Sequence, residues 1–279
     1  MQKRDMWMCI RRILAIVLIG FILFSWRSAY AWRCSMNAAE SELIVIYDNH
    51  TLKKELTSAW GFSCLINHPR YHILFDTGGD SSILLKNMNR MDIDPRIVDS
   101  IVLSHIHGDH VGGLSGLLQY HHDVTVYLPK SFPRSFKEGV ILTGARVKEV
   151  KEPVMIHSGV YTTGELGVGI KEQSLVLKTR EGLCIVTGCA HPGIIEIVKQ
   201  ARRLFRDKVH LLIGGFHLMG GSSKEIKGII KNLEELEVEM VAPCHCSGDT
   251  ARKFFGQHFK ESYIECGAGL ALEIPDLKE

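Results

Sequence analysis

A short segment of the chain combines four side chains that can bind a metal ion. The segment 104–113, Ser-His-Ile-His-Gly-Asp-His-Val-Gly-Gly, holds three imidazoles and one carboxylate in the order His-x-His-x-Asp-His. Residues two apart in an extended segment point the same way, so His105 and His107 can bind one ion together. Asp109 and His110 follow after a turn and can face a second ion beside the first. Imidazole with carboxylate suits zinc, and also iron or manganese, better than calcium or magnesium.

The elements predicted around this segment place its ligands at the end of a strand. Residues 99–103 form a mostly apolar run that predicts a buried strand, and Gly112-Gly113-Leu114 indicates the start of a helix. A histidine-rich surface turn is the alternative interpretation. Four ligands at this spacing, directly between an apolar strand and a helix start, argue against it.

Three later histidines occupy the same kind of position. Each comes two to four residues after the end of a predicted strand, lies beside or close to a glycine or proline, and precedes a predicted helix. The strands are 182–187, 209–213 and 239–243, the histidines are His191, His217 and His245, and the helices are 194–205, 224–236 and one starting near Asp249. Open α/β sheets collect such residues on one rim. The sequence therefore predicts one site built from four segments, with an isolated structural histidine as the alternative at each later position.

The remaining chain alternates strands and helices, which predicts an α/β fold. Strands are expected at 42–47 and 124–128, hairpins at 60–66 with 71–75 and at 173–179 with 182–187, and a helix at 81–89. Residues 130–170 hold short strand-like runs punctuated by glycine, without recognisable chemistry. The turn Ser247-Gly248 precedes a helix N-terminus and offers a seat for a substrate phosphate, or serves only as a helix cap.

The first 31 residues have the pattern of an export signal. A basic start is followed by a 14-residue apolar run at 13–26 and by Ala29-Tyr30-Ala31, a small-x-small cleavage pattern. We expect cleavage after Ala31, a single domain over 32–279, and a periplasmic or extracellular location. An uncleaved leader would anchor the chain in a membrane with the domain outside. Translation from Met36 would instead give a cytoplasmic protein.

Net charge and cysteine content further restrict the expected partner and location of the protein. The leader carries five Lys/Arg and one Asp, so the rest of the chain has 28 basic and 30 acidic residues, or a net charge of −2. A nucleic-acid partner would need a concentrated basic face, so we expect a small-molecule substrate. The seven cysteines after the leader lack the spacing of a disulfide framework. Free thiols are unusual in exported proteins, which favours the Met36 start or a weakly oxidising envelope.

The motifs resemble the metallo-β-lactamase superfamily over nearly all of residues 42–274. Within it they look like the branch that contains the archaeal dihydropterin-(ribofuranosyl)aminobenzene 5′-phosphate synthases and many metal-dependent hydrolases. The segments that carry this resemblance are Tyr47-Asp48-Asn49, Phe75-Asp76-Thr77-Gly78, 104–113, Gly188-Cys189-Ala190-His191-Pro192-Gly193, Gly214-Gly215-Phe216-His217-Leu218 and His245-Cys246-Ser247-Gly248. The resemblance implies an αβ/βα four-layer sandwich with a metal site at one edge between two sheets.

The resemblance also implies a role for each site residue. The first metal ion would be held by His105, His107 and His191, and the second by Asp109, His110 and His245. Asp76, at a strand end before Gly78-Gly79, would orient a metal ligand. One departure stands out: where many superfamily hydrolases place a bridging aspartate, this chain has His217. The resemblance therefore leaves open whether one or two ions bind.

Three functions follow from these expectations. The leading one is a Zn²⁺-dependent hydrolase, with Mn or Fe as possible metals, that uses a metal-activated water on an ester, lactone or phosphoester. In it Asp109 orients the water, and His217 donates or carries a proton. The second is a transferase that condenses a dihydropterin pyrophosphate with 4-(β-D-ribofuranosyl)aminobenzene 5′-phosphate. An export signal argues against it, because those substrates are kept in the cytoplasm. The third is a non-enzymatic metal-binding sensor.

Overall fold

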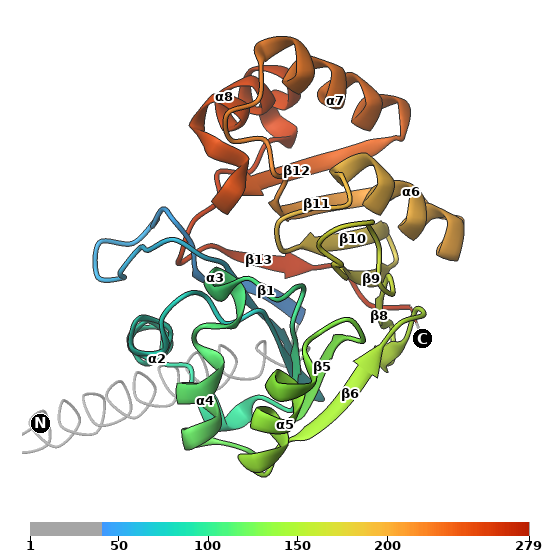
Figure 1. Ribbon diagram of the computed structural model, residues 1–279. Helices are drawn as coiled ribbons and strands as arrows, with labels where there is room; N and C mark the ends of the chain where they lie inside the picture. Colours follow the sequence, from blue (N-terminus) through green and yellow to red (C-terminus); the bar gives the residue numbers. More distant parts are fainter. Residues whose placement is uncertain (1–40, 279) are drawn as a thin grey trace, which may run out of the picture. The chain divides into compact units, whose positions relative to one another are not determined.

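Two β-sheets lie face to face, and helices cover the outer face of each sheet (Figure 1). The computed structural model describes residues 41–278. The predicted leader, its cleavage after Ala31 and the alternative start at Met36 lie outside the described residues. Within the described part of the chain, no helix is both long enough and apolar enough to cross a membrane.

The first sheet has seven strands and the second has six. In spatial order the first sheet consists of β13 (Ala271–Ile274), β1 (Ser41–Tyr47), β2 (Ser63–His68), β3 (Tyr71–Phe75), β4 (Ser100–Val102), β5 (Thr125–Pro129) and β6 (Arg146–Val150). The second consists of β12 (Val238–Cys244), β11 (Val209–Gly215), β10 (Gly182–Thr187), β9 (Leu175–Thr179), β8 (Val160–Thr162) and β7 (Met155–His157). The expected hairpins β2–β3 and β9–β10 are antiparallel pairs.

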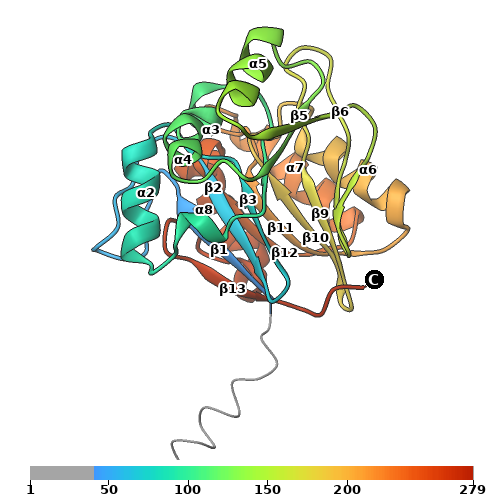
Figure 2. The same ribbon diagram turned by 90° about the horizontal axis from the view of Figure 1, so that it is seen from below.

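The helices form the two outer layers, which Figure 2 shows on either side of the sheets. The first sheet is covered by α2 (Ser81–Arg90), α4 (Leu114–Tyr120) and α5 (Arg134–Leu142), and the second by α6 (Ile194–Phe205), α7 (Ser223–Glu235) and α8 (Gly248–Phe259). Short helical turns lie at α3 (Gly108–Val111), Pro95–Ile97, His245–Ser247 and Lys260–Ser262. The order helix, sheet, sheet, helix confirms the predicted four-layer αβ/βα sandwich.

Alternation along the strands explains the layering. In β3, Ile73 and Phe75 pack between the two sheets, whereas Leu74 packs under the helices of the first sheet. In β11, Ile213 faces the space between the sheets and Leu212 faces the outer helices. Successive side chains of a strand point to opposite faces, and here both faces are covered. The central strands are therefore almost continuously apolar, which is the pattern that the sequence showed.

Parallel strands bring the predicted site segments to one rim. In the first sheet β3, β4 and β5 run parallel, and in the second β10, β11 and β12 run parallel. Ser104 and His105 follow closely after β4, and the segments with His191, His217 and His245 follow β10, β11 and β12. The topology thus gathers four loops that are far apart in the sequence.

Two elements differ from the sequence-based expectation. The strand expected at 60–66 begins only at Ser63, because Gly61 has φ +143° and turns the chain there. A Cβ on Gly61 would lie 2.5 Å from the carbonyl oxygen of Asp109, so only glycine allows this approach. In the 130–170 region, α5 forms where only strand-like runs were expected. Phe136 and Val140 give it an apolar stripe that is only one turn long.

Candidate metal centre

The first group of candidate ligands consists of three imidazoles. Nε2 of His105 lies 3.1 Å from Nδ1 of His107. The ring of His191 lies 4.7 Å from the ring of His105 and 4.8 Å from that of His107, measured between centroids. Nε2 of His191 is buried and has no hydrogen-bond partner among the described residues. A buried nitrogen without a partner is costly, and a bound cation would remove that cost.

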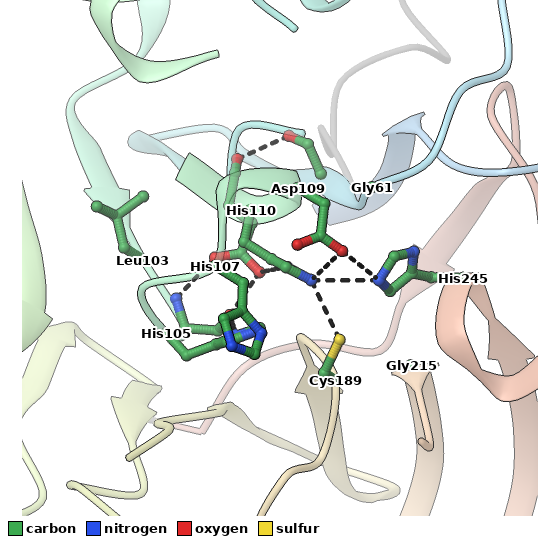
Figure 3. A network of polar contacts seen from close by, with 12 residues as sticks. Gly61, Leu103, His105, His107, Asp109, His110, Cys189, Gly215 and His245 are labelled. Atoms are coloured by element: carbon green, nitrogen blue, oxygen red, sulfur yellow. Dashed lines mark hydrogen bonds and ion pairs between the residues drawn. The ribbon is translucent and has the colours of Figure 1, made fainter. Parts of the chain in front are cut away.

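The second group adjoins the first and adds a carboxylate and a thiol. Nε2 of His110 lies 3.2 Å from Nε2 of His245 and 3.2 Å from Sγ of Cys189. Oδ2 of Asp109 lies 3.2 Å from Nε2 of His245. His110 and His245 are buried, and the Asp109 side chain is 20% exposed. Figure 3 shows these four side chains converging from α3, from the loop after β10 and from the end of β12.

The charges of these groups fit a divalent cation. Burial, reinforced by the neighbouring imidazoles, lowers the pKa of His105 far below its usual range, and burial lowers that of His191 to about 4. Both rings are therefore neutral near pH 7, with lone pairs available. Burial would raise the pKa of Asp109, but its hydrogen bond with His245 and the nearby His110 hold it low, so it stays a carboxylate. Metal ligation requires these protonation states.

Hydrogen bonds from outside the two groups fix the orientation of three rings. Nδ1 of His110 donates to Oδ2 of Asp76 over 2.7 Å, and Nδ1 of His245 donates to Oδ1 of Asn49 over 3.1 Å. Nδ1 of His105 lies 2.9 Å from Oγ of Ser104, which itself donates to Asp76 over 2.7 Å. Each contact occupies Nδ1 and leaves Nε2 facing the other ligands, as metal-binding histidines require. Asp76 therefore lies where the predicted orienting carboxylate should be.

A buried carboxylate also holds the backbone of the His191 loop. The two oxygens of Glu172 accept hydrogen bonds from the backbone N–H groups of Cys189, Ala190 and His191, at 2.9, 2.9 and 2.8 Å. Burial raises the pKa of Glu172, and these three donors oppose that effect. Asp48 plays the same part for His245, because its Oδ2 accepts from the His245 backbone N–H over 3.0 Å.

The loops adopt uncommon backbone conformations at the site. Asp76, Ala190, His217 and His245 have φ values of 55°, 59°, 54° and 46°, in the left-handed region that side chains other than glycine rarely adopt. Each such residue costs on the order of 1–3 kcal/mol, and the surrounding structure must supply that energy. Strain gathered at the ends of four strands is typical of a functional site.

The metal-capable groups open into a pocket of about 340 Å³. Its lining consists of Trp60, His107, Asp109, Cys189, His191, His217, Met219 and Cys246. His217 stands beside the first group, with its ring 4.5 Å from that of His191. It also forms a third metal-capable set with Cys189 and Cys246. The indole of Trp60 is 48% exposed and lies 4.9 Å from the ring of His245.

In the structure, the Ser247 side chain that was suggested as a phosphate-binding group makes a contact within the fold. The Ser247 side chain is buried, and its hydroxyl accepts a hydrogen bond from the backbone N–H of Phe216 over 3.0 Å. It therefore joins the ends of β11 and β12 and does not cap α8. Gly248 has φ +75° and lies against Met219. The side chain that the sequence offered for a phosphate is thus engaged within the fold.

The structure brings the predicted histidines together and adds several neighbours that the sequence does not single out. Cys189, two residues before His191 in the motif Gly188-Cys189-Ala190-His191, belongs to a segment that carries the resemblance but has no ligand role in the sequence analysis. Asn49 occurs in the sequence analysis only within the segment Tyr47-Asp48-Asn49, and Glu172 precedes the predicted strand 173–179 without an expected role. The spacing of Cys189 and His191 was the one local signal for a further ligand. Nothing near Asn49 or Glu172 in the sequence indicates which distant loops they hold.

Comparison with known proteins finds one matching family and several relatives of similar length. The family model described as "Metallo-beta-lactamase superfamily" matches residues 61–245. A protein of Methanocaldococcus jannaschii named 7,8-dihydropterin-6-methyl-4-(beta-D-ribofuranosyl)-aminobenzene-5′-phosphate synthase is 30% identical, over 86% of this chain and 99% of its own length. A second protein of that organism, which is uncharacterised, is 28% identical over 74% of this chain and 91% of its own length.

Solved structures show the same relationship. A metal-dependent hydrolase of the β-lactamase superfamily superimposes with a TM-score of 0.72 at 30% identity, covering 85% of this chain and all of that one. The short form of human tRNase Z gives a TM-score of 0.57 at 13% identity, covering 84% of this chain and 99% of that one, a likeness of fold alone.

Proposed function

The chain belongs to the metallo-β-lactamase superfamily, and from that premise we propose that it is a metal-dependent hydrolase of a small ester, lactone or phosphoester. One observation carries the proposal: two adjoining groups of metal-capable side chains, His105/His107/His191 and Asp109/His110/His245 with Cys189, each contribute two residues to the lining of one pocket. Sites that hold two metal ions are a common arrangement in phosphatases, nucleases and aminopeptidases.

The ligand chemistry suits Zn²⁺, with iron or manganese as alternatives. Imidazoles dominate the first group, and the second adds a carboxylate and a thiol. A divalent ion held by these residues would supply a nucleophile at neutral pH, by lowering the pKa of a bound water molecule, and would act as a Lewis acid toward the substrate. Orientation of the water molecule and transfer of protons would then be the role of side chains.

Asp109 and His217 are the residues that we assign to this work. Asp109 stays a carboxylate beside His245 and is partly exposed to the pocket, so it can accept a hydrogen bond from the attacking water and fix its direction. His217 lines the same pocket with an exposed imidazole. From there it can pass a proton to the departing oxygen.

The pocket lining favours a neutral or apolar substrate body with its reacting group at the metal ions. The residues that line it include no lysine or arginine. A phosphate or carboxylate of the substrate would therefore be neutralised mainly by the bound ions. The exposed faces of Trp60 and Met219, 48% and 60% accessible, offer contact for the rest of the molecule.

A second candidate is a transferase that joins a dihydropterin pyrophosphate to 4-(β-D-ribofuranosyl)aminobenzene 5′-phosphate. Two observations favour it: the name of the 30% identical relative from M. jannaschii, and the indole of Trp60 at the mouth of the pocket. An exposed indole can stack on a planar ring such as a pterin or an aminobenzene. In this reaction the site would bind the pyrophosphate leaving group and exclude water.

One set of assays separates the candidates. The purified full chain is analysed for metal content and then assayed with phosphoester, lactone and β-lactam substrates and with the pterin pair, each with and without a chelator. Chelator-sensitive turnover of an ester supports the hydrolase, and activity only with the pterin pair supports the transferase. Metal bound without turnover of any of these substrates would point to a metal-binding sensor.

A matched pair of variants ties turnover to the site. His191→Ala removes a candidate ligand, whereas His72→Ala removes a partly exposed histidine of β3 that contacts Asp99. We expect the first to lose turnover and bound metal and the second to keep both. Equal loss in the two variants would contradict the assignment of the site.

A further inference from the structure

Resting on the metal-dependent function proposed above, we infer that Cys189 coordinates the second metal ion through its sulfur. It would complete a set of four ligands with Asp109, His110 and His245. This position matters because the resemblance left the second ion short of a ligand: His217 stands where relatives have a bridging aspartate. The sulfur of Cys189 comes from a different strand end, the one that also delivers His191.

The spacing of the four ligand atoms fits a single ion. Bond lengths of about 2.0–2.3 Å in a tetrahedral zinc site imply ligand-to-ligand distances of roughly 3.3–3.6 Å. The His110 Nε2 atom lies 3.2 Å from Cys189 Sγ, 3.2 Å from His245 Nε2 and 3.6 Å from Asp109 Oδ2. The distance from His245 Nε2 to Asp109 Oδ2 is 3.2 Å. Four of the six edges thus match a tetrahedron closely, and all four atoms lie within 4.8 Å of one another.

The backbone between Cys189 and His191 explains how one loop serves two ions. In an extended strand these two side chains would point to the same side. Ala190 between them has φ 59°, which turns the chain, and Glu172 holds all three backbone N–H groups in that turn. His191 consequently joins the first group of ligands and Cys189 joins the second.

A second thiol lies beside Cys189 but is placed differently. Sγ of Cys246 donates to the backbone carbonyl of Cys189 over 3.5 Å and does not belong to the group around His110. It fits there because residue 215 is glycine: a Cβ at that position would lie 2.6 Å from the Cys246 sulfur. Both cysteines are free and buried. We therefore treat Cys246 as a positioning residue for the Cys189 loop.

A sulfur ligand would narrow the choice of metal. Thiolate is a soft ligand that favours zinc, cobalt, cadmium or iron over manganese and magnesium, which prefer oxygen ligands. The second ion of this chain should therefore discriminate against Mn²⁺ more strongly than a site built from carboxylates and imidazoles.

Cobalt spectroscopy tests the inference directly. The full chain is stripped of metal, reloaded with Co²⁺ and examined for bound cobalt and for the intense near-ultraviolet band of a sulfur-to-cobalt charge transfer. We expect two bound ions and a band that Cys189→Ser abolishes and Cys246→Ser retains. Cys184→Ser, which changes another buried thiol on β10 away from the pocket, is the matched control and should also retain the band.

The outcomes separate this inference from the proposed function. Two bound ions without the band, a band that survives Cys189→Ser, or a band lost only in Cys246→Ser would overturn the role of Cys189 and leave the metal-dependent function intact. Failure of the stripped chain to bind cobalt at all would overturn both.

A second variant at the same position distinguishes loss of the sulfur ligand from misfolding of Cys189→Ser. Cys189→Asp replaces the sulfur with an oxygen ligand of the same charge, and circular dichroism melts check that each variant folds. We expect this variant to bind the second ion but to lose preference for Zn²⁺ over Mn²⁺ by roughly tenfold or more in competition titrations. An unchanged preference would count against sulfur ligation.

Discussion

The carboxylate of Asp76 lies 2.7 Å from Nδ1 of His110, and both side chains are fully buried. The same carboxylate accepts the backbone N–H of Ser104 over 2.6 Å and its hydroxyl over 2.7 Å. Asp76 therefore links the end of β3 to the loop after β4 and to the α3 turn. Its three contacts fix the direction in which the ligands of that loop and turn point.

Replacing Asp76 with asparagine should weaken metal binding more than it weakens the fold. The amide has one acceptor oxygen and adds a donor group next to donors, so at least one contact is lost. Changes of this kind typically lower metal affinity by about 10- to 100-fold. Competition with a chromogenic chelator measures the affinity. Asp94→Asn, which alters an exposed carboxylate paired with Arg96, is the control and should leave the affinity unchanged.

The sequence predicted the fold and the candidate ligands because both depend on local patterns. Apolar strands, glycine-rich turns and helix starts repeat along the chain, and His191, His217 and His245 each come within four residues of a strand end. Parallel strands then bring those ends together, as β10, β11 and β12 do for His191, His217 and His245. The convergence of these separated segments therefore follows from two things: histidines placed at strand ends, and parallel strands whose ends meet at one edge of the sheet.

The residues that the sequence did not reveal act over long distances. Asn49 reaches His245, 196 residues away, and Glu172 holds a loop 17 to 19 residues further along. The sequence predicts Trp60 to be part of a strand. In the structure the chain turns at Gly61, and the indole of Trp60 packs against the ring of His245. Such contacts depend on how loops pack, which no local pattern specifies.

Removal of the metal ions should destabilise the folded chain and abolish turnover. The candidate ligands converge only in the native state, so an ion binds the folded chain in preference to the unfolded one. An ion at 100 times its dissociation constant stabilises such a protein by about 2.7 kcal/mol. Thermal melts with and without chelator, followed by addition of Zn²⁺, measure the effect. A melting temperature that does not respond to either treatment would argue against bound metal.

Glu172→Gln should loosen the loop that carries Cys189 and His191. One acceptor oxygen becomes an amide group that donates, so at least one of the three backbone N–H groups loses its partner. An unsatisfied buried donor costs about 1–3 kcal/mol. Denaturant unfolding measures the loss of stability, and metal titration should show weaker binding of both ions because each group draws one ligand from this loop. The variant Glu181→Gln, at an exposed carboxylate on the turn between β9 and β10, controls for the charge change.

Trp60 should govern how tightly substrates with an aromatic group bind. Its indole is 48% exposed at the pocket and packs 4.9 Å from the His245 ring, so a planar ring can stack on its free face. Loss of such a contact costs about 0.5–1.5 kcal/mol beyond the area buried, which raises KM roughly three- to tenfold or more. Because the contact is the same in the ground state and the transition state, kcat should change little. We expect Trp60→Ala to show this pattern with aromatic esters, Trp60→Phe to show a smaller rise, and both to turn over a small aliphatic ester normally. A parallel fall in kcat with every substrate, accompanied by weaker metal binding, would mean instead that Trp60 acts by holding His245 in place.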